Sequence, residues 1–147
     1  MANTQIDTDA VVTVLNKILE AELAGVVRYT HYALMVFGYN RIPIVSWMRS
    51  QATESLTHAN EAGELITHLN AHPSLGIGPL LETHRHDIGD ILRESLEHEA
   101  LALAEYTHLL ELVEGRNVLL EEYARRMIAQ EEMHLGDVRK MLKKPDE

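Results

Sequence analysis

The sequence predicts an all-α fold: a four-helix bundle made of two antiparallel helix hairpins joined by a long crossover. Glycine and proline gather in the stretches 38–43 and 73–79 and at Gly115, and they divide the 147 residues into four long segments. Each segment repeats apolar residues at steps of three and four and is rich in strong helix formers. We therefore expect helices at about 8–38, 43–70, 85–114 and 117–143, within a single domain spanning 1–147.

The residues between these segments suit helix ends. Pro43 suits the first position of a helix, Gly115 a C-terminal cap and Asn117 an N-cap. The link 71–84 (AHPSLGIGPLLETH) is long, whereas the other two links are short. Short links make neighbouring helices antiparallel and a long link makes a crossover, which gives the order hairpin, crossover, hairpin.

Composition excludes several classes of function. With 13 basic and 23 acidic residues the net charge is −10, which disfavours nucleic acid as a partner. The absence of cysteine excludes disulfides, thiolate metal sites and a cysteine nucleophile. No signal peptide or membrane-spanning stretch is evident, so we expect a cytoplasmic protein without a membrane partner. Nine histidines on a chain rich in glutamate supply the ligand types of zinc, iron and manganese sites.

The second half of the chain partly repeats the first at an offset of 77 residues. The matched pairs include Glu22 with Glu99, Tyr29 with Tyr106, Gly38 with Gly115 and Glu54 with Glu131. This repeat predicts two similar hairpins related by a pseudo-twofold axis.

Six ionisable residues interrupt the apolar stripes near the middle of the expected helices: Glu22, Glu54, His58, Glu99, Glu131 and His134. Buried carboxylates are costly unless they are paired or bind a metal. Mid-helix positions meet at one level of an antiparallel bundle, where four empty carboxylates would repel one another. Two divalent ions would neutralise them, so the pattern predicts a dinuclear metal centre with these six ligands.

These residues resemble the ferritin-like di-iron carboxylate superfamily, and bacterioferritin in particular. Glu131 and His134 form its Glu-x-x-His motif; Leu15–Leu23 (LNKILEAEL) and Tyr29, seven residues after Glu22, resemble the first helix of bacterioferritin. The resemblance implies a ferroxidase that binds two iron ions, for which manganese or zinc could substitute, and oxidises Fe²⁺ with dioxygen or peroxide. It implies a role in iron handling or storage, with the six residues above as ligands and catalytic residues.

The sequence departs from bacterioferritin in three places. Glu54 and His58 are spaced Glu-x-x-x-His, which we interpret as an inserted residue absorbed by a π-bulge, with Glu61 as the competing ligand. The haem-ligating methionine is replaced by Leu56, or by Ser55 if Glu54 is aligned instead, so we expect no haem. The chain stops soon after its fourth helix, without the fifth helix of bacterioferritin, which argues against a 24-subunit cage. We expect at least a homodimer, with a larger shell as the alternative.

Two other functions stay open: a di-iron oxidase or oxygenase acting on a small substrate, which needs an apolar pocket beside the metals, and a metal-free helical interaction module. Tyr29 and Tyr106 either hydrogen-bond the carboxylates, act as radical sinks or only pack in the core. We interpret His84 and His86 as a surface metal site without function. The remaining histidines are interpreted as solvated or locally hydrogen-bonded: His31, His68, His72, His98 and His108.

Overall fold

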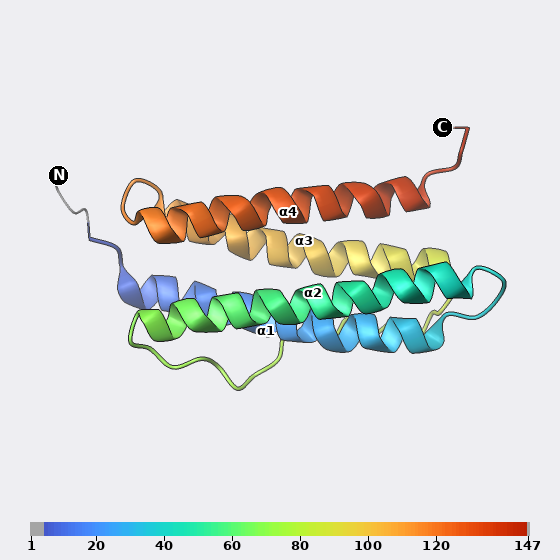
Figure 1. Cartoon of the computed structure of the whole chain (residues 1–147), viewed down its shortest axis with the longest axis horizontal. Helices are drawn as coiled ribbons and strands as arrows, with labels where there is room; N and C mark the ends of the chain where they lie inside the picture. The colour runs from blue at the N-terminus through green and yellow to red at the C-terminus, as the bar shows by residue number, and fades with distance from the viewer. Residues whose placement is uncertain (1–4, 147) are drawn as a thin grey trace.

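The computed structural model describes residues 5–146 and contains four long helices in that range, with no strand. They are α1 (Thr8–Met35), α2 (Arg41–His68), α3 (Ile88–Val113) and α4 (Val118–Leu142). α1 packs against α2, α3 against α4, and α1 against α3, so the two hairpins form one bundle (Figure 1). The all-α fold is confirmed, and each helix begins and ends within three residues of the predicted position.

Local sequence explains most helix ends. The side chain of Asn117 accepts a hydrogen bond from the backbone N–H of Leu120 and caps α4, as predicted. Gly115 follows α3 with φ +73°, a left-handed conformation that glycine adopts without a Cβ penalty. The prediction for Pro43 was wrong in detail, because α2 begins at Arg41. Pro43 is still in the first turn, where the helix does not need its missing N–H.

The crossover between α2 and α3 is non-helical and runs along the outside of α1 (Figure 1). The N–H of Gly78 donates to the carbonyl oxygen of Glu20 at 2.9 Å, and a Cβ at Gly78 would lie 3.1 Å from that oxygen. Ser74 Oγ donates to the Glu20 carboxylate at 2.5 Å. These contacts fix the path of the crossover toward the start of α3.

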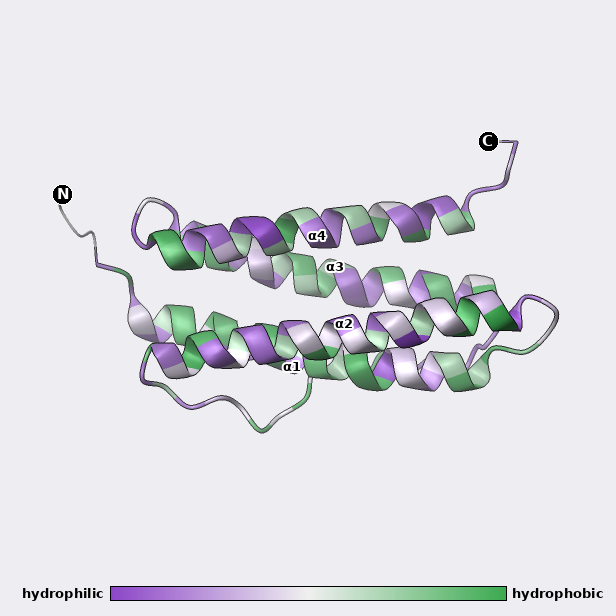
Figure 2. Cartoon of the chain, viewed as in Figure 1, coloured by the Kyte–Doolittle hydropathy of each residue, from purple (hydrophilic) through white to green (hydrophobic). Residues whose placement is uncertain are grey.

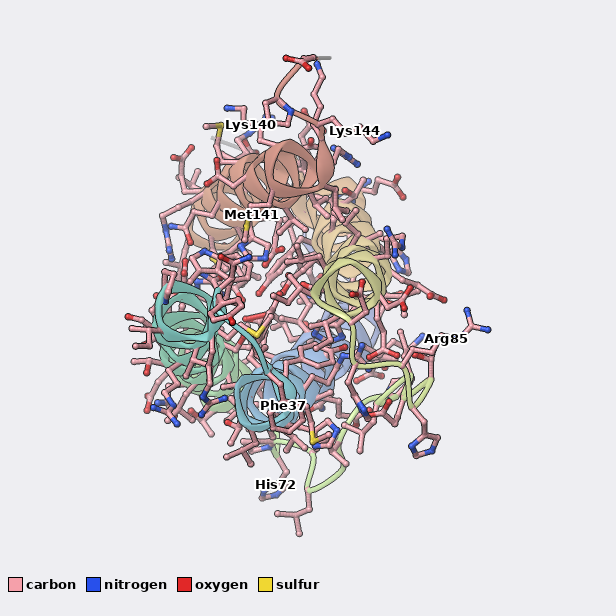
Figure 3. The ribbon with its side chains drawn as sticks, turned by 90° about the vertical axis from the view of Figure 1, so that its right-hand side faces the viewer. Phe37, His72, Arg85, Lys140, Met141 and Lys144 are labelled. Atoms are coloured by element: carbon pink, nitrogen blue, oxygen red, sulfur yellow. The ribbon has the colours of Figure 1, made fainter. Side chains whose placement is uncertain are left out.

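Every helix is amphipathic, and apolar and polar residues alternate along each ribbon in Figure 2. Viewed along the bundle in Figure 3, side chains fill the space between the four helices. The α1–α2 loop with Phe37 and the crossover end with Arg85 lie at the viewer's end. Within residues 5–146, no helix is both long enough and apolar enough to cross a membrane.

The apolar core is split into two clusters. One lies toward the start of α1 and includes Leu15, Ile66, Leu109 and Met127; the other lies toward its end and includes Tyr32, Met48, Ile91 and Val138. On every helix the ionisable residues fall in sequence between the two clusters. The bundle therefore buries a polar layer across its middle, where apolar packing would otherwise be continuous.

Candidate metal centre

Each helix contributes to the polar layer, and three of its four glutamates are almost fully buried. Glu22 on α1, Glu99 on α3 and Glu131 on α4 are 2%, 5% and 4% exposed. His58 on α2 is 7% exposed, and the side chain of His134 on α4 is 15% exposed. Burial of this many carboxylates is unfavourable unless protons or cations compensate them.

The first half of the layer joins α1 to α2. His58 Nδ1 lies 2.7 Å from Glu22 Oε2. His58 Nε2 lies 3.1 Å from the amide oxygen of Gln130 and 3.7 Å from Glu54 Oε1. Both ring nitrogens of His58 therefore face ligand-type groups inside the bundle.

The second half joins α1, α3 and α4. Tyr29 donates its hydroxyl hydrogen to Glu99 Oε1 at 2.7 Å, and the same hydroxyl lies 3.1 Å from His134 Nε2. His134 Nε2 lies 3.7 Å from Glu99 Oε1, and Glu131 is a neighbouring carboxylate on which the charge of Glu99 acts. Tyr29 thus orients a carboxylate and an imidazole that come from the other hairpin.

Burial changes the acidity of these groups. It raises the pKa of Glu22 to about 7, although the neighbouring His58 acts in the opposite direction. Burial, together with the charge of Glu99, raises the pKa of Glu131 far above its usual range. Burial opposes protonation of His58, but contact with Glu22 and the nearby carboxylates raise its pKa overall. Without a cation, therefore, the Glu99–Glu131 pair holds a proton at neutral pH.

The donor set fits first-row transition metals. Ligand atoms from Glu22, His58 and Glu131 all lie within 4.8 Å of one another. Glu131 Oε2 is buried and has no hydrogen-bond partner among the described residues. A buried carboxylate oxygen without a partner is the position that a bound cation would satisfy. Carboxylate and imidazole together suit iron, manganese and zinc.

Helix α2 differs from the prediction in two ways. It is an uninterrupted α-helix from Arg41 to His68, so the expected π-bulge is absent. In a regular helix it is Ser55, three residues before His58, that faces the core, and Ser55 is buried. The Glu54 side chain is 50% exposed. Glu54 therefore lies at the rim of the layer rather than in the core stripe, and it still approaches His58 because a four-residue step keeps both side chains on nearby faces.

The competing ligand Glu61 is directed elsewhere. Its Oε2 lies 2.9 Å from the guanidinium of Arg126 on α4, in an exposed pair. Since the carboxylate of Glu61 is already paired with the guanidinium of Arg126, the geometry favours Glu54 over Glu61 as the α2 carboxylate of the centre.

A cavity of about 10 Å³ lies within the layer. Its lining residues are Gln51, Glu54, Ser55, His58, Glu99, Gln130, Glu131 and His134. A groove outside it, between α2 and α4, shares four of these residues and adds Trp47, whose ring stacks on His134 with centroids 5.8 Å apart. The cavity thus adjoins the protein surface through Glu54 and Gln130.

Sequence periodicity missed several residues around the centre. Ser95 and His98 on α3 are buried, so of the two states expected for His98, solvated or locally hydrogen-bonded, the solvated one is wrong. His98 lies opposite Gly25, where a Cβ would be 3.2 Å from its Nε2 and 2.8 Å from Ser55 Oγ. Neither residue stands out in the sequence, because a close approach between helices leaves no signal apart from a glycine.

Comparison with known proteins gives the family. The family model for the ferritin-like domain matches residues 12–147. The chain belongs to the ferritin-like domain family. Comparison with curated proteins gives no significant match.

Solved structures agree on the ferritin-like fold. A ferritin-like diiron-carboxylate protein from Bacillus anthracis superposes with a TM-score of 0.87 at 22% identity, covering 97% of this chain and 100% of that one. A dodecameric thioferritin, the bacterioferritin-related protein of Bacteroides fragilis, gives 0.81 at 23%, covering 94% and 87%. Rhodobacter capsulatus bacterioferritin, with a metal-free dinuclear site and haem iron, gives 0.84 at 20%, covering 95% and 86%.

Proposed function

We propose that this ferritin-like chain binds two Fe²⁺ ions per bundle and oxidises them with dioxygen or peroxide. The observation that carries the proposal is the polar layer, in which three almost fully buried glutamates and two histidines meet between two apolar clusters. Family membership supports iron as the metal. The sequence similarity to iron-binding relatives is too low to carry the assignment of individual residues, so the ligands are proposed from the geometry.

In this proposal each half of the layer holds one iron ion. Glu22, His58 and Glu54 hold one ion, Glu99 and His134 hold the other, and Glu131 lies between the two halves. The unpartnered Oε2 of Glu131 supports its place between them. Tyr29 holds Glu99 in place through its hydroxyl and fixes the position of His134, as second-layer hydrogen bonds commonly do for metal ligands.

Electrons balance with dioxygen or peroxide as the oxidant, and the two protons that each route consumes come from solvent water. Two Fe²⁺ ions give up one electron each, and dioxygen takes two electrons and two protons to leave as hydrogen peroxide. If peroxide is the oxidant, it takes two electrons and two protons and yields two water molecules. The proton of the Glu99–Glu131 pair leaves when iron binds, since only the ionised carboxylates are ligands.

The cavity argues against the alternative of a small organic substrate. At about 10 Å³ it is too small for an organic molecule, and polar side chains surround it. The adjoining groove is larger, at about 390 Å³, but it is open to solvent and partly lined by Gln51, Glu54 and Asp137, so it is not the apolar pocket that this alternative needs. A metal-free interaction module would have no use for a buried carboxylate layer that costs stability. We therefore favour iron oxidation, within iron handling or storage in the cytoplasm.

The assembly is proposed to be at least a homodimer. Large apolar side chains are exposed near the α1–α2 turn, including Phe37 at 70% and Ile42 at 83%. Such a patch is typical of a surface that another protein covers. The related Bacteroides fragilis protein is dodecameric, which makes a larger shell the alternative. No haem is expected, since Leu56 and Ser55 offer no thioether ligand.

Anaerobic titration with Fe²⁺ tests the proposal. We expect the wild type to bind two more Fe²⁺ ions per chain than Glu131→Gln. Exposure to air should then convert bound Fe²⁺ to a ferric species in the wild type only. Glu132→Gln, an exposed neighbour on α4, is the matched control and should behave as wild type. Equal iron binding by wild type and Glu131→Gln would overturn the proposal; binding without oxidation would restrict it to iron binding.

A further inference from the structure

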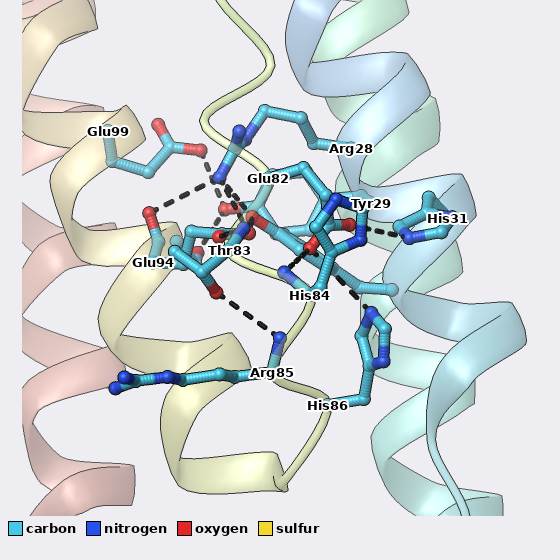
Figure 4. Close-up of polar contacts among 12 residues, drawn as sticks. Arg28, Tyr29, His31, Glu82, Thr83, His84, Arg85, His86, Glu94 and Glu99 are labelled. Atoms are coloured by element: carbon cyan, nitrogen blue, oxygen red, sulfur yellow. Dashed lines mark hydrogen bonds and ion pairs between the residues drawn. The ribbon is translucent and has the colours of Figure 1, made fainter.

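A second group of metal-ligating side chains lies on the outside of the bundle, where the crossover reaches α3. His31 comes from α1, and Glu82 and His86 come from the last residues of the crossover (Figure 4). One ligand atom from each lies within 4.8 Å of the others. Nothing in the sequence pattern joins these three residues, because His31 and Glu82 are 51 positions apart.

The geometry of this cluster is close to that of a metal site. His31 Nε2 lies 2.7 Å from Glu82 Oε2, and His86 Nε2 lies 3.7 Å from Glu82 Oε1. Ligand atoms of a tetrahedral site with bonds of about 2.1 Å are separated by about 3.4 Å, so small side-chain rotations would suffice. The two imidazole rings meet edge to face, with centroids 5.8 Å apart.

The state of the ligand atoms also favours a cation. His86 Nε2 is buried from solvent and has no hydrogen-bond partner among the described residues, although the whole side chain is 26% exposed. The N–H of His84 donates to Glu82 Oε1 at 2.5 Å, which fixes the orientation of this carboxylate. The Glu82 carboxylate therefore lies beside an imidazole nitrogen that has no hydrogen-bond partner among the described residues.

The surroundings hold the ligands in place. Glu94 on α3 accepts a hydrogen bond from the N–H of Thr83 at 2.8 Å, which fixes the residue next to Glu82. Arg28 lies 3.2 Å from the same Glu94, and both side chains are almost fully buried. The hydroxyl of Tyr32 also donates to Glu94, at 2.5 Å. The negative charge of Glu94 offsets the positive charge of Arg28. Arg28 therefore repels a metal ion bound by His31, Glu82 and His86 less than an unpaired guanidinium would.

We propose that His31, Glu82 and His86 form a second metal site, for a divalent first-row transition metal ion such as Zn²⁺. Two imidazoles and one carboxylate are ligands that such ions prefer, and the partial exposure of the cluster leaves coordination positions for water. Its ligands come from two segments, so a bound ion would clamp the crossover to α1. The sequence prediction paired His86 with His84; in the structure its partners are Glu82 and His31. This site does not depend on the function proposed for the buried centre.

A calorimetric titration of the full chain with Zn²⁺ tests the site. His31→Gln/His86→Gln should bind one Zn²⁺ per chain fewer than the wild type, or bind it at least about tenfold more weakly, while binding at the buried centre is kept. His84→Gln, an exposed histidine of the same segment, is the matched control and should match the wild type. Identical isotherms for the double variant and the wild type would overturn the site.

A second readout separates binding from any effect on folding. Co²⁺ bound to the wild type should give visible absorption that decreases in the double variant, while circular dichroism shows the same helix content. In the Glu131→Gln background, where the buried centre is disabled, the double substitution should still remove one Co²⁺. If it removes none there, a cation does not occupy this cluster and the proposal fails.

Discussion

The substitution Glu22→Gln should remove part of the pH dependence of the free energy of unfolding of the metal-free protein. Burial raises the pKa of Glu22 from 4.5 to about 7. In the unfolded chain the carboxyl ionises near 4.5, so between pH 4.5 and 7 the native state binds more protons than the unfolded state. Stability must then fall as pH rises, and the loss is complete above pH 7.

The magnitude follows from the size of the change in acidity. At about 1.4 kcal/mol for each tenfold change in proton affinity, Glu22 removes about 3 kcal/mol of stability between pH 4.5 and pH 8. Glutamine keeps the shape and cannot ionise. Relative to wild type, Glu22→Gln should therefore gain about 3 kcal/mol over this pH range.

Urea unfolding of chelator-treated protein, followed by circular dichroism at pH 5, 6, 7 and 8, measures this difference. Protein concentration is held constant because the chain is expected to associate. Glu97→Gln, an exposed glutamate on α3, is the control and should give a difference that does not change with pH. A flat difference for Glu22→Gln as well would refute the claim that the layer buries a carboxylate at an energetic cost.

Three further predictions concern the packing and chemistry of the same layer. Gly25→Ala should destabilise the protein by about 1–3 kcal/mol, because its Cβ would lie 2.8 Å from Ser55 Oγ. Gly136→Ala, where the added Cβ meets open space, should stabilise it by up to about 1 kcal/mol. Urea unfolding measures both, and equal effects would contradict the close packing at Gly25. Tyr29→Phe should keep iron binding but slow oxidation in stopped-flow absorbance by about tenfold, since it frees a ligand carboxylate; an unchanged rate would limit Tyr29 to packing. Calorimetry in buffers of different ionisation enthalpy should show that metal binding at pH 7 releases at least one proton per chain, and that this release is lost in Glu131→Gln. Equal proton release by the variant would show that the Glu99–Glu131 pair does not hold the proton.

Much of the fold follows from sequence because helix signals are local. Periodicity, the cap at Asn117 and the long crossover were enough to predict four helices in two hairpins. Pro43 shows the limit, since proline is accepted anywhere in a first turn and does not mark its first residue. The central polar layer was also predictable, because an ionisable residue in an apolar stripe is visible without a structure.

The fine geometry of the site was less predictable. The spacing of Glu54 and His58 was compatible with both a bulged and a regular helix, and the structure has the regular one, with Ser55 close to Gly25 of α1. The outer cluster of His31, Glu82 and His86 depends on the path of a non-helical crossover. That path is set by contacts with α1 and Glu94, which no periodic pattern records.

Anomalous scattering at the iron absorption edge, from crystals grown anaerobically with Fe²⁺, tests the central claim most directly. The account predicts two peaks inside the bundle, one beside Glu22 and His58 and one beside Glu99 and His134, with Glu131 next to both. Crystals of Glu131→Gln should lose both peaks. The absence of any anomalous peak in the polar layer of the wild type, with iron bound only at the surface, would contradict the account.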